Sequence, residues 1–345
     1  MANVFRFQRF NFFLFSTNAG FSIMAILVNQ NLNTVTSPHL SIIVISYNTK
    51  KLTIKCLESV FVETLQTSFE VIVVDNASSD GSSKAIEDLF LDKVTLISSS
   101  KNLGFAAANN LAAGKANGKF ILLLNPDTEI IDNAIDALIE FSSLHKTAKI
   151  WGGKTLFADG TINPTSCWRK MSLWSLLSQA FGLSSIFRNS SIFNPERIGH
   201  WNSDSTKYVD IVSGCFFMIE KEFWIQLNGF DKDFFMYGEE ADLCLRASVL
   251  EAKPMVTSKA TIIHHGGASE TIRADKLVRL IDAKMKLIQK HFPVHSEKIG
   301  LFLLSMWPFS RYQMHRLLAF FERPSSKKSV LVWKDVWDRK PSWKK

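Results

Sequence analysis

The sequence of 345 residues predicts a doubly wound α/β fold. Two β-branched apolar runs, 40–47 and 71–74, are continuous rather than alternating, which is typical of strands buried on both faces of a parallel sheet. Residues 53–65 between them carry apolar side chains at helical spacing, so the order is strand, helix, strand. With 46% hydrophobic and 21% charged residues, the composition is that of a globular protein.

The alternation continues along the chain. We expect, in order, a helix at 82–91, a strand at 94–97, a helix at 106–116 and a strand at 120–124. In open α/β sheets, ligands bind outside the carboxyl ends of the strands. The chain has neither a Gly-x-Gly-x-x-Gly sequence nor a Walker loop, so dinucleotide oxidoreductases and P-loop enzymes lose their motif support.

Polar residues stand where these strands end. They are Ser46, Tyr47 and Asn48, then Asp75, then Asn102 and Gly104 at the start of a helix, and Asn125 and Asp127. Asp75 is suited to accepting hydrogen bonds from a base or ribose, and Asp127 to binding a divalent cation on a diphosphate. Each could instead be an ordinary turn or helix cap. Four such groups at successive strand ends favour a ligand site.

From 154 to 210 the pattern loosens into short pieces rich in Trp and Arg, which we interpret as a variable region on the acceptor side. A strand is expected at 208–220. Within it, Ser213 and Gly214 either allow close approach of a sugar or mark a bulge.

An acidic, aromatic stretch at 229–246 precedes a helix expected at 241–252. Carboxylates among aromatic rings suit a general base, because apolar surroundings raise a carboxylate's proton affinity. The alternative is a solvated helix start, where Glu239 and Glu240 favour the helix dipole. His264, after a strand at 260–263, is either a metal or diphosphate ligand or a structural histidine.

The two ends of the chain differ from its middle. Residues 1–39 contain no acid and are weakly apolar, which predicts an extension, a weak membrane-associating arm or a misassigned start. Residues 276–292 predict an amphipathic helix, and 299–309 and 311–321 are apolar segments too short to span a bilayer. These helices lie either in the headgroup plane of a membrane or against the catalytic domain.

Charge and cysteine usage add two expectations. Net charge is +8, and residues 323–345 carry six of these excess positive charges, which favours an anionic membrane surface or a solubilising tail over nucleic acid. The four cysteines are widely spaced, as expected of reduced thiols in a cytosolic protein.

Taken in order, the motifs resemble glycosyltransferase family 2, and most closely its bacterial rhamnosyltransferase-like branch. They are VISYN (44–48), VDNASSDG (74–81), NLGFA (102–106), LNPD (124–127), GFD (229–231), FFMYGEEADL (234–243) and HHGGAS (264–269). The resemblance covers roughly residues 40–270. It implies a GT-A fold with a Rossmann-like mixed sheet, and inverting transfer from a nucleotide-diphosphate sugar with Mg²⁺ or Mn²⁺.

The resemblance also implies roles for individual residues. Asp127 and His264 would bind the metal, and Glu240 would be the general base, with Glu239 able to share that task. The family typically has Glu-Asp at these two glutamates, and Asn125 replaces the first acid of its Asp-x-Asp motif. The donor site would include Ser46, Tyr47, Asn48, Asp75, Asn102, Gly104, Asn125, Asp127 and Gly214, and the acceptor site Asp242, Tyr237 and Trp201.

These residues predict a glycosyltransferase domain at 40–270, with a nucleotide-sugar half at 40–150 and an acceptor half at 151–270, then an amphipathic region at 271–322 and a basic tail at 323–345. The expected reaction moves rhamnose from dTDP-rhamnose to a glycan or polyprenyl-linked glycan in surface polysaccharide assembly, at the cytoplasmic face of the inner membrane. The alternatives are a UDP-hexose or UDP-galactofuranose donor, or a catalytically silent sugar- or membrane-binding module.

Overall fold

A computed structural model describes residues 5–7, 10–17, 20–24, 37–198, 204–266, 273–321 and 324–343. The chain forms two units, residues 1–37 and 38–345. In the first, β1 (Phe5–Phe7), β2 (Phe10–Thr17) and β3 (Gly20–Met24) form a three-stranded antiparallel sheet. The site residues that the structure describes all belong to the second unit.

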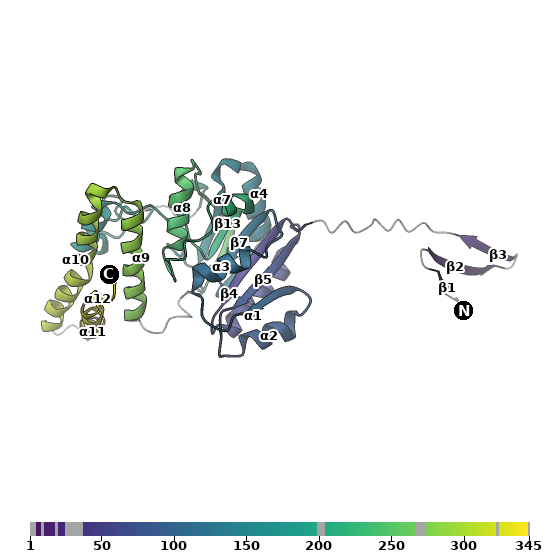
Figure 1. Cartoon of the computed structure of the whole chain (residues 1–345), viewed down its shortest axis with the longest axis horizontal. Coiled ribbons are helices and arrows are strands. Elements are labelled where there is room, and N and C mark those ends of the chain that lie inside the picture. The colour runs from purple at the N-terminus through teal and green to yellow at the C-terminus, as the bar shows by residue number, and fades with distance from the viewer. Residues whose placement is uncertain are drawn as a thin grey trace. The chain divides into compact units, whose positions relative to one another are not determined.

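The second unit is built on a nine-stranded mixed sheet in the order β11-β14-β9-β13-β7-β4-β5-β6, with β8 paired to β14. Figure 1 labels β13, β7, β4 and β5 of this sheet. Its parallel part is β4 (Leu40–Ser46), β5 (Phe69–Asp75), β6 (Val94–Ser98) and β7 (Phe120–Leu124). The remaining strands are β8 (Thr128–Ile130), β9 (Ile150–Leu156), β11 (Lys207–Tyr208), β13 (Phe216–Glu220) and β14 (Met255–His264). The predicted sheet is therefore confirmed as a mixed one, because β13 runs antiparallel to both β7 and β9.

Both faces of this sheet are buried. Successive residues of β4 point to opposite sides, so that Ile43 and Ile45 join one core cluster while Ile42 and Val44 join another. The first cluster includes α3 (Phe105–Ala113), α7 (Lys221–Gln226) and α8 (Glu239–Val249). The second includes α1 (Lys50–Glu63), α2 (Ser82–Phe90) and α4 (Ala134–Leu144). Helices on both faces explain why the parallel strands are continuous apolar runs.

The strand predicted over 208–220 is wrong in extent. The segment divides into β11, β12 (Ile211–Val212) and β13, and β12 pairs with β10 (Cys167–Trp168) outside the large sheet. A backbone hydrogen bond of 2.9 Å from the Ser213 nitrogen to the Ser166 oxygen holds the chain away from the sheet at this point. The break places Gly214 at the cavity described below.

The helices predicted between 276 and 321 are confirmed, and the stretch 323–345, which was expected as a basic tail, is helical too over most of its described residues. All of these helices pack on the rest of the unit. They are α9 (Arg273–His291), α10 (Val294–Phe320), α11 (Pro324–Asp338) and α12 (Lys340–Trp343). The two segments predicted at 299–309 and 311–321 form one helix of 27 residues that continues through Pro308. Trp333 and Val336 of α11 are buried in a third core cluster, which also takes in Leu176 of α5 (Leu173–Ala180).

Helix α9 contacts α8 on one side and α10 and α11 on another, and it separates these two groups of helices in Figure 1. The short elements α6 (Leu183–Ile186) and η1 (Lys146–Ala148) complete the unit. Among the described helices, none combines the length and apolar character that crossing a membrane requires.

Candidate active site

A cavity of about 1260 Å³ opens at the carboxyl ends of the parallel strands. Its walls come from three parts of the chain. The strand ends supply Tyr47, Asn76, Asn102, Asn125 and Asp127, the acidic stretch supplies Tyr237, Glu239 and Glu240, and α9 supplies Lys276, Arg279 and Lys284. Gly214 and His264 also line it. The structure therefore brings most of the predicted site residues into one space.

Asp127 and His264 face each other within this cavity. The antiparallel pairing of β8 with β14 sets His264 opposite Thr128, so His264 Nε2 lies 3.3 Å from Asp127 Oδ1. Burial alone would lower the pKa of His264, but the side chains of Asp127 and Cys215 raise it to about 10. The pKa of Asp127 is lowered, since its interactions with His264 outweigh the effect of burial. The pair can therefore hold a proton between them or present a carboxylate and an imidazole to a cation.

Asp127 and His264 are the side chains expected to bind a divalent cation. In the described residues, no group of three His, Cys, Asp or Glu side chains converges on a point that could hold a metal. Asp127 and His264 are two such donors, and Mg²⁺ is commonly bound by one or two carboxylates together with substrate phosphates and water. The residues thus fit a cation whose remaining ligands come from the substrate.

Glu239 and Glu240 occupy the first turn of α8, directly after Gly238, which begins the helix with φ +86°. Oε2 of each glutamate is buried and has no hydrogen-bond partner among the described residues. The pKa of Glu239 is raised well above its ordinary value of 4.5, first by burial and then by the charge of Glu240. Burial raises the pKa of Glu240 as well, while backbone amides of the helix start oppose this shift.

Two adjacent carboxylates in one buried turn cannot both ionise easily. Glu239 is the more deeply buried, with 4% of its surface exposed, and it carries the stronger upward shift in pKa. The arrangement therefore favours a proton on Glu239 and a negative charge on Glu240. With Glu239 protonated and Glu240 ionised in apolar surroundings, Glu240 is suited to act as a base.

The start of α3 lies against the acidic stretch. Gly104 has φ +79°, and a Cβ added there would lie 2.4 Å from the carbonyl oxygen of Phe235. The next residue, Phe105, donates its backbone N–H to that same oxygen at 2.8 Å. Gly104 therefore allows the backbones of two walls of the cavity to meet, and only a residue without a side chain fits.

Asn76, which directly follows β5, links this strand end to the loop before α3, and it is not among the predicted site residues. Its Nδ2 lies 3.0 Å from Asn102 Oδ1, and its Oδ1 accepts the Leu103 N–H at 2.8 Å. Asp75 ends β5 with one oxygen accepting the Ser78 N–H at 3.3 Å, and its Oδ1 is buried without a hydrogen-bond partner among the described residues. In the sequence, the signal for both residues is that Asp75 and Asn76 directly follow the apolar run 71–74.

Several predicted site residues lie outside the cavity lining. Ser46 is buried with its hydroxyl 3.0 Å from Thr53 Oγ1, and Asn48 accepts the Ser79 N–H at 2.8 Å. Both fix the turns at the strand ends rather than facing the cavity. Trp201, predicted at the acceptor, lies outside the described residues.

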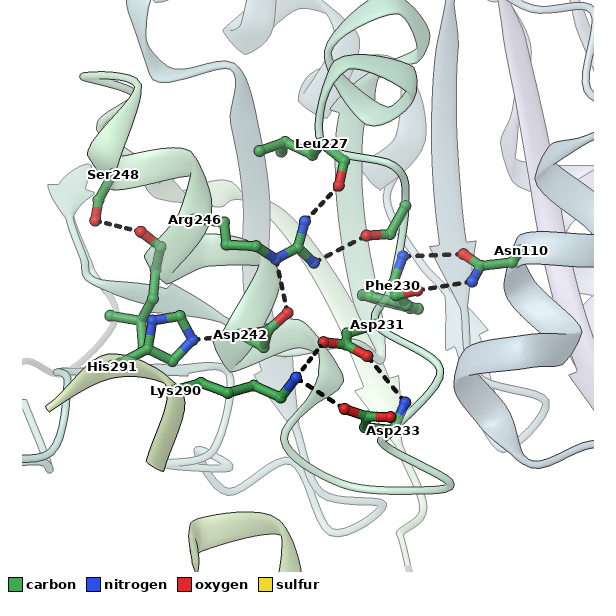
Figure 2. A network of polar contacts seen from close by, with 12 residues as sticks. Asn110, Leu227, Phe230, Asp231, Asp233, Asp242, Arg246, Ser248, Lys290 and His291 are labelled. Carbon is green, nitrogen blue, oxygen red and sulfur yellow. Dashed lines mark hydrogen bonds and ion pairs between the residues drawn. The ribbon is translucent and has the colours of Figure 1, made fainter. Parts of the chain in front are cut away.

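Asp242 also points away from the cavity. Its side chain is 2% exposed, and its two oxygens lie 2.8 Å from Arg246 Nε and 2.8 Å from His291 Nε2 (Figure 2). Arg246 in turn donates to the carbonyl oxygens of Leu227 and Gly229. Asp242 thus joins α8, the acidic stretch and α9 instead of facing an acceptor.

A second set of contacts fastens the acidic stretch to α9. Lys290 Nζ lies 2.7 Å from Asp231 Oδ2 and 2.9 Å from Asp233 Oδ2, as Figure 2 shows. Lys286 Nζ donates to the carbonyl oxygen of Asp233 at 2.7 Å. The acidic stretch, which carries the two glutamates, is therefore fixed to α9, a helix that follows it in the sequence.

The contribution of α9 to the cavity was not found from the sequence. The sequence signal was the alternation of Lys and Arg with apolar residues, which shows an amphipathic helix but not what its polar face meets. In the structure Lys276 Nζ lies 5.8 Å from the centre of the Tyr237 ring, and Arg279 lies 5.9 Å from the centre of the Phe235 ring. These cations therefore stand over the aromatic part of the acidic stretch.

Comparison with known proteins places this site in context. The sequence model of a family described as "Glycosyl transferase family 2" matches residues 41–219. An O-antigen biosynthesis protein RfbC of Myxococcus xanthus is 26% identical over 253 residues, which are 70% of this chain and 18% of that protein. An N-acetylglucosaminyl-diphospho-decaprenol L-rhamnosyltransferase of Mycobacterium tuberculosis is 27% identical over 213 residues, 56% of this chain and 66% of that one. The chain thus spans less than two thirds of both relatives.

Among solved structures, the mannosyltransferase PcManGT of Pyrobaculum calidifontis, in complex with GDP-Man and Mn²⁺, superposes with a TM-score of 0.53. It is 15% identical in sequence, and the match covers 90% of this chain and 88% of that one. At this level of identity the likeness shows the fold, which is GT-A as predicted.

Proposed function

Because the chain belongs to glycosyl transferase family 2, we propose that it transfers a sugar from a nucleotide-diphosphate donor to a hydroxyl group of a glycan acceptor, with inversion at the anomeric carbon. One observation carries the proposal. Asp127 and His264, which suit the diphosphate end of a donor, line the same cavity as the buried glutamate pair. A transferase needs both functions within reach of one anomeric carbon.

Glu240 is the general base in this proposal. Its carboxylate takes the proton of the acceptor hydroxyl while that oxygen forms a bond to the anomeric carbon, and the bond from this carbon to the diphosphate oxygen breaks on the opposite face. The electron pair of the broken bond leaves with the nucleoside diphosphate. Glu239 keeps its proton, because burial and the neighbouring charge of Glu240 raise its pKa.

Asp127 and His264 would hold Mg²⁺ or Mn²⁺ together with the donor diphosphate. The cation, when bound, supplies positive charge that offsets the charge of the departing diphosphate. The leaving group is thereby activated, so no carboxylic acid is needed to protonate it. This differs from glycoside hydrolysis, where two carboxyl groups flank the scissile bond.

We propose rhamnose from dTDP-rhamnose as the sugar and a polyprenyl-linked glycan as the acceptor, in surface polysaccharide assembly. The names of the Mycobacterium tuberculosis and Myxococcus xanthus relatives support this choice. A UDP-hexose or UDP-galactofuranose is the alternative donor, because the residues assigned above would hold the nucleotide and the diphosphate, and none of them is assigned to the sugar ring.

A peripheral contact with the inner membrane at its cytoplasmic face is part of the proposal. On α10, Phe302, Leu317 and Phe320 are 60%, 61% and 80% exposed, and Arg316 lies beside the last two. Exposed apolar side chains next to cations suit the headgroup layer of an anionic bilayer. Sedimentation with phosphatidylglycerol vesicles should exceed that with phosphatidylcholine vesicles, and Phe320→Ser should reduce it. Equal sedimentation with both kinds of vesicle would contradict the proposed membrane contact.

The central experiment measures thermal stability with dTDP-rhamnose, UDP-glucose, UDP-N-acetylglucosamine and UDP-galactofuranose, each with Mn²⁺ and with EDTA. A ligand that binds only the folded state raises the melting temperature. We expect one donor to give a shift that EDTA removes and that Asp127→Asn reduces. The absence of any shift, together with the absence of transfer from every donor, would contradict the proposed function.

A further inference from the structure

One end of the cavity is rich in unpaired positive charge. Lys170, Arg197 and Lys276 line it, and all three are exposed. Within the part of the chain that the structure describes, no carboxylate forms an ion pair with any of them. Like charges that gather in a concave space repel one another, and they raise the local concentration of anions there.

Two acids of the cavity lining near these cations already have cationic partners. Glu196 Oε2 lies 3.3 Å from Lys284 Nζ, and Asp275 Oδ1 lies 2.6 Å from Arg339 Nη1. These pairs use cations other than the three above. The excess of positive charge is therefore a property of this end of the cavity, and it is not the unpaired half of an internal salt bridge.

Hydrogen bonds hold the three cations on neighbouring elements. The Arg169 N–H donates to the Glu196 carbonyl at 2.8 Å, which sets the chain before Lys170 beside the chain before Arg197. The backbone N–H of Lys170 donates to Asp210 Oδ2 at 2.9 Å. The pair between Lys284 and Glu196 ties this segment to α9, which carries Lys276.

One of these cations, Lys276, lies beside the acidic stretch that carries the proposed base. Lys276 Nζ lies 5.8 Å from the centre of the ring of Tyr237, two residues before Glu239. Asp127 and His264 come from β8 and β14 and their connections, on other elements. The cavity of about 1260 Å³ also exceeds the roughly 300–1,000 Å³ of typical small-molecule sites, so it has room for two substrates.

We propose that Lys170, Arg197 and Lys276 bind the phosphate or diphosphate group of an acceptor, so that the acceptor is recognised by its anionic end and not by its sugar alone. The inference rests on the proposed transfer reaction. Phosphate oxygens form strong, charge-assisted hydrogen bonds with Lys and Arg, and a diphosphate would neutralise the excess charge at this end. The same chemistry could serve the donor diphosphate, and the experiment separates these two sources.

The test compares Lys170→Gln and Lys276→Gln with wild type. Lys276→Arg keeps the charge, and Lys259→Gln removes an exposed lysine of β14 that does not line the cavity. The apparent KM is measured for a diphosphate-bearing acceptor analogue and for the same glycan without phosphate, and donor affinity is measured by titration with the nucleotide sugar. We expect KM for the diphosphate analogue to rise about 10-fold or more in both Gln variants, as is typical for a lost hydrogen bond to a charged group.

The control variants and control measurements should give wild-type values. Lys276→Arg should restore KM, and Lys259→Gln, the phosphate-free glycan and donor affinity should all behave as in wild type. If the Gln variants instead weakened donor binding, the anion would be the donor's and the acceptor assignment would be overturned. Unchanged KM and donor affinity would also overturn it.

A binding measurement separates this inference from the proposed function. Calorimetric titration with inorganic pyrophosphate in EDTA requires no turnover. If the protein transfers no sugar, weaker pyrophosphate binding by Lys170→Gln and Lys276→Gln than by Lys259→Gln would still support the anion site. Equal binding by all three variants would overturn it.

Discussion

Nε2 of His291 lies 2.8 Å from Oδ1 of Asp242, which joins the last residue of α9 to the first turn of α8 (Figure 2). The same turn carries Glu239 and Glu240. The position of the proposed base therefore depends on a helix that lies beyond the residues carrying the family motifs. Asp242 acts as a positioning residue in this arrangement, because it touches Arg246 and His291 and not the cavity.

Asp242→Asn should destabilise the protein by about 3–5 kcal/mol, the range for breaking a buried ion pair by removing one partner. The change leaves the guanidinium of Arg246 without its carboxylate partner, and the Asp242 side chain is only 2% exposed. Urea unfolding measures the loss. Lys334→Ala, which breaks an exposed pair with Asp338, is the matched control and should cost much less, because solvent screens exposed ion pairs. Similar losses in the two variants would contradict the positioning role.

Glu240→Gln should reduce transfer by about 10²- to 10⁴-fold, the usual contribution of a general base. Nucleotide-sugar binding should remain, because the proposed donor site is made of other residues. Glu239→Gln should keep most of the activity, since an amide resembles the protonated carboxyl that burial favours at this position. Rates under single-turnover conditions measure both changes. Greater damage from Glu239→Gln than from Glu240→Gln would exchange the two roles.

The raised pKa of Glu239 should also make stability depend on pH. A carboxyl whose folded pKa lies above its unfolded value contributes stability that is fully present below the unfolded pKa of 4.5 and is lost as pH rises through the folded pKa. Wild type should therefore lose more stability than Glu239→Gln between pH 5 and pH 8. Melting temperatures across this range measure the difference. Glu87→Gln, at an exposed position of α2, should follow wild type, and parallel curves for all three proteins would refute the assignment.

The parallel half of the sheet could be predicted because its signal is local. Each of β4, β5 and β7 is a continuous apolar run bounded by polar turns. Strand β9 could not be predicted, because it contains Gly152 and Gly153, which weaken the strand pattern. The packing explains these glycines: a Cβ at the first would lie 2.4 Å from Val212 Cγ1, and a Cβ at the second 2.1 Å from the Ala260 oxygen.

The site residues also divide into those with a local sequence signal and those brought together only by the fold. Asp127, Glu240 and His264 stand in short motifs, so their chemistry could be inferred from neighbouring residues. The cationic wall of α9 could not, because Lys276 meets Tyr237 only through tertiary packing of two segments about 40 residues apart. Asp242 was assigned to the acceptor since it shares a motif with the base, yet the helical turn directs it to the opposite side, toward Arg246 and His291.

The backbones of Gly104 and Phe235 meet where α3 begins. Gly104→Ala places a methyl group 2.4 Å from the Phe235 oxygen and forces a non-glycine residue to φ +79°. Gly104 has ψ 170° as well, a backbone conformation that is essentially restricted to glycine and costs other residues on the order of 1–3 kcal/mol. The clash adds about 1–3 kcal/mol unless the acidic stretch moves. If it moves, Glu239 and Glu240 move with it.

Gly160→Ala separates the backbone cost from the effect of the clash with Phe235. Gly160 also has a positive φ, +80°, but a Cβ there would meet no atom within 4 Å. Gly160→Ala should therefore lose only the backbone cost and keep full activity, whereas Gly104→Ala should lose more stability and at least about 10-fold in transfer rate, as expected when reacting groups shift by about an ångström. Urea unfolding and single-turnover rates on both variants measure this. Equal losses would mean that the junction between α3 and the acidic stretch does not position the base.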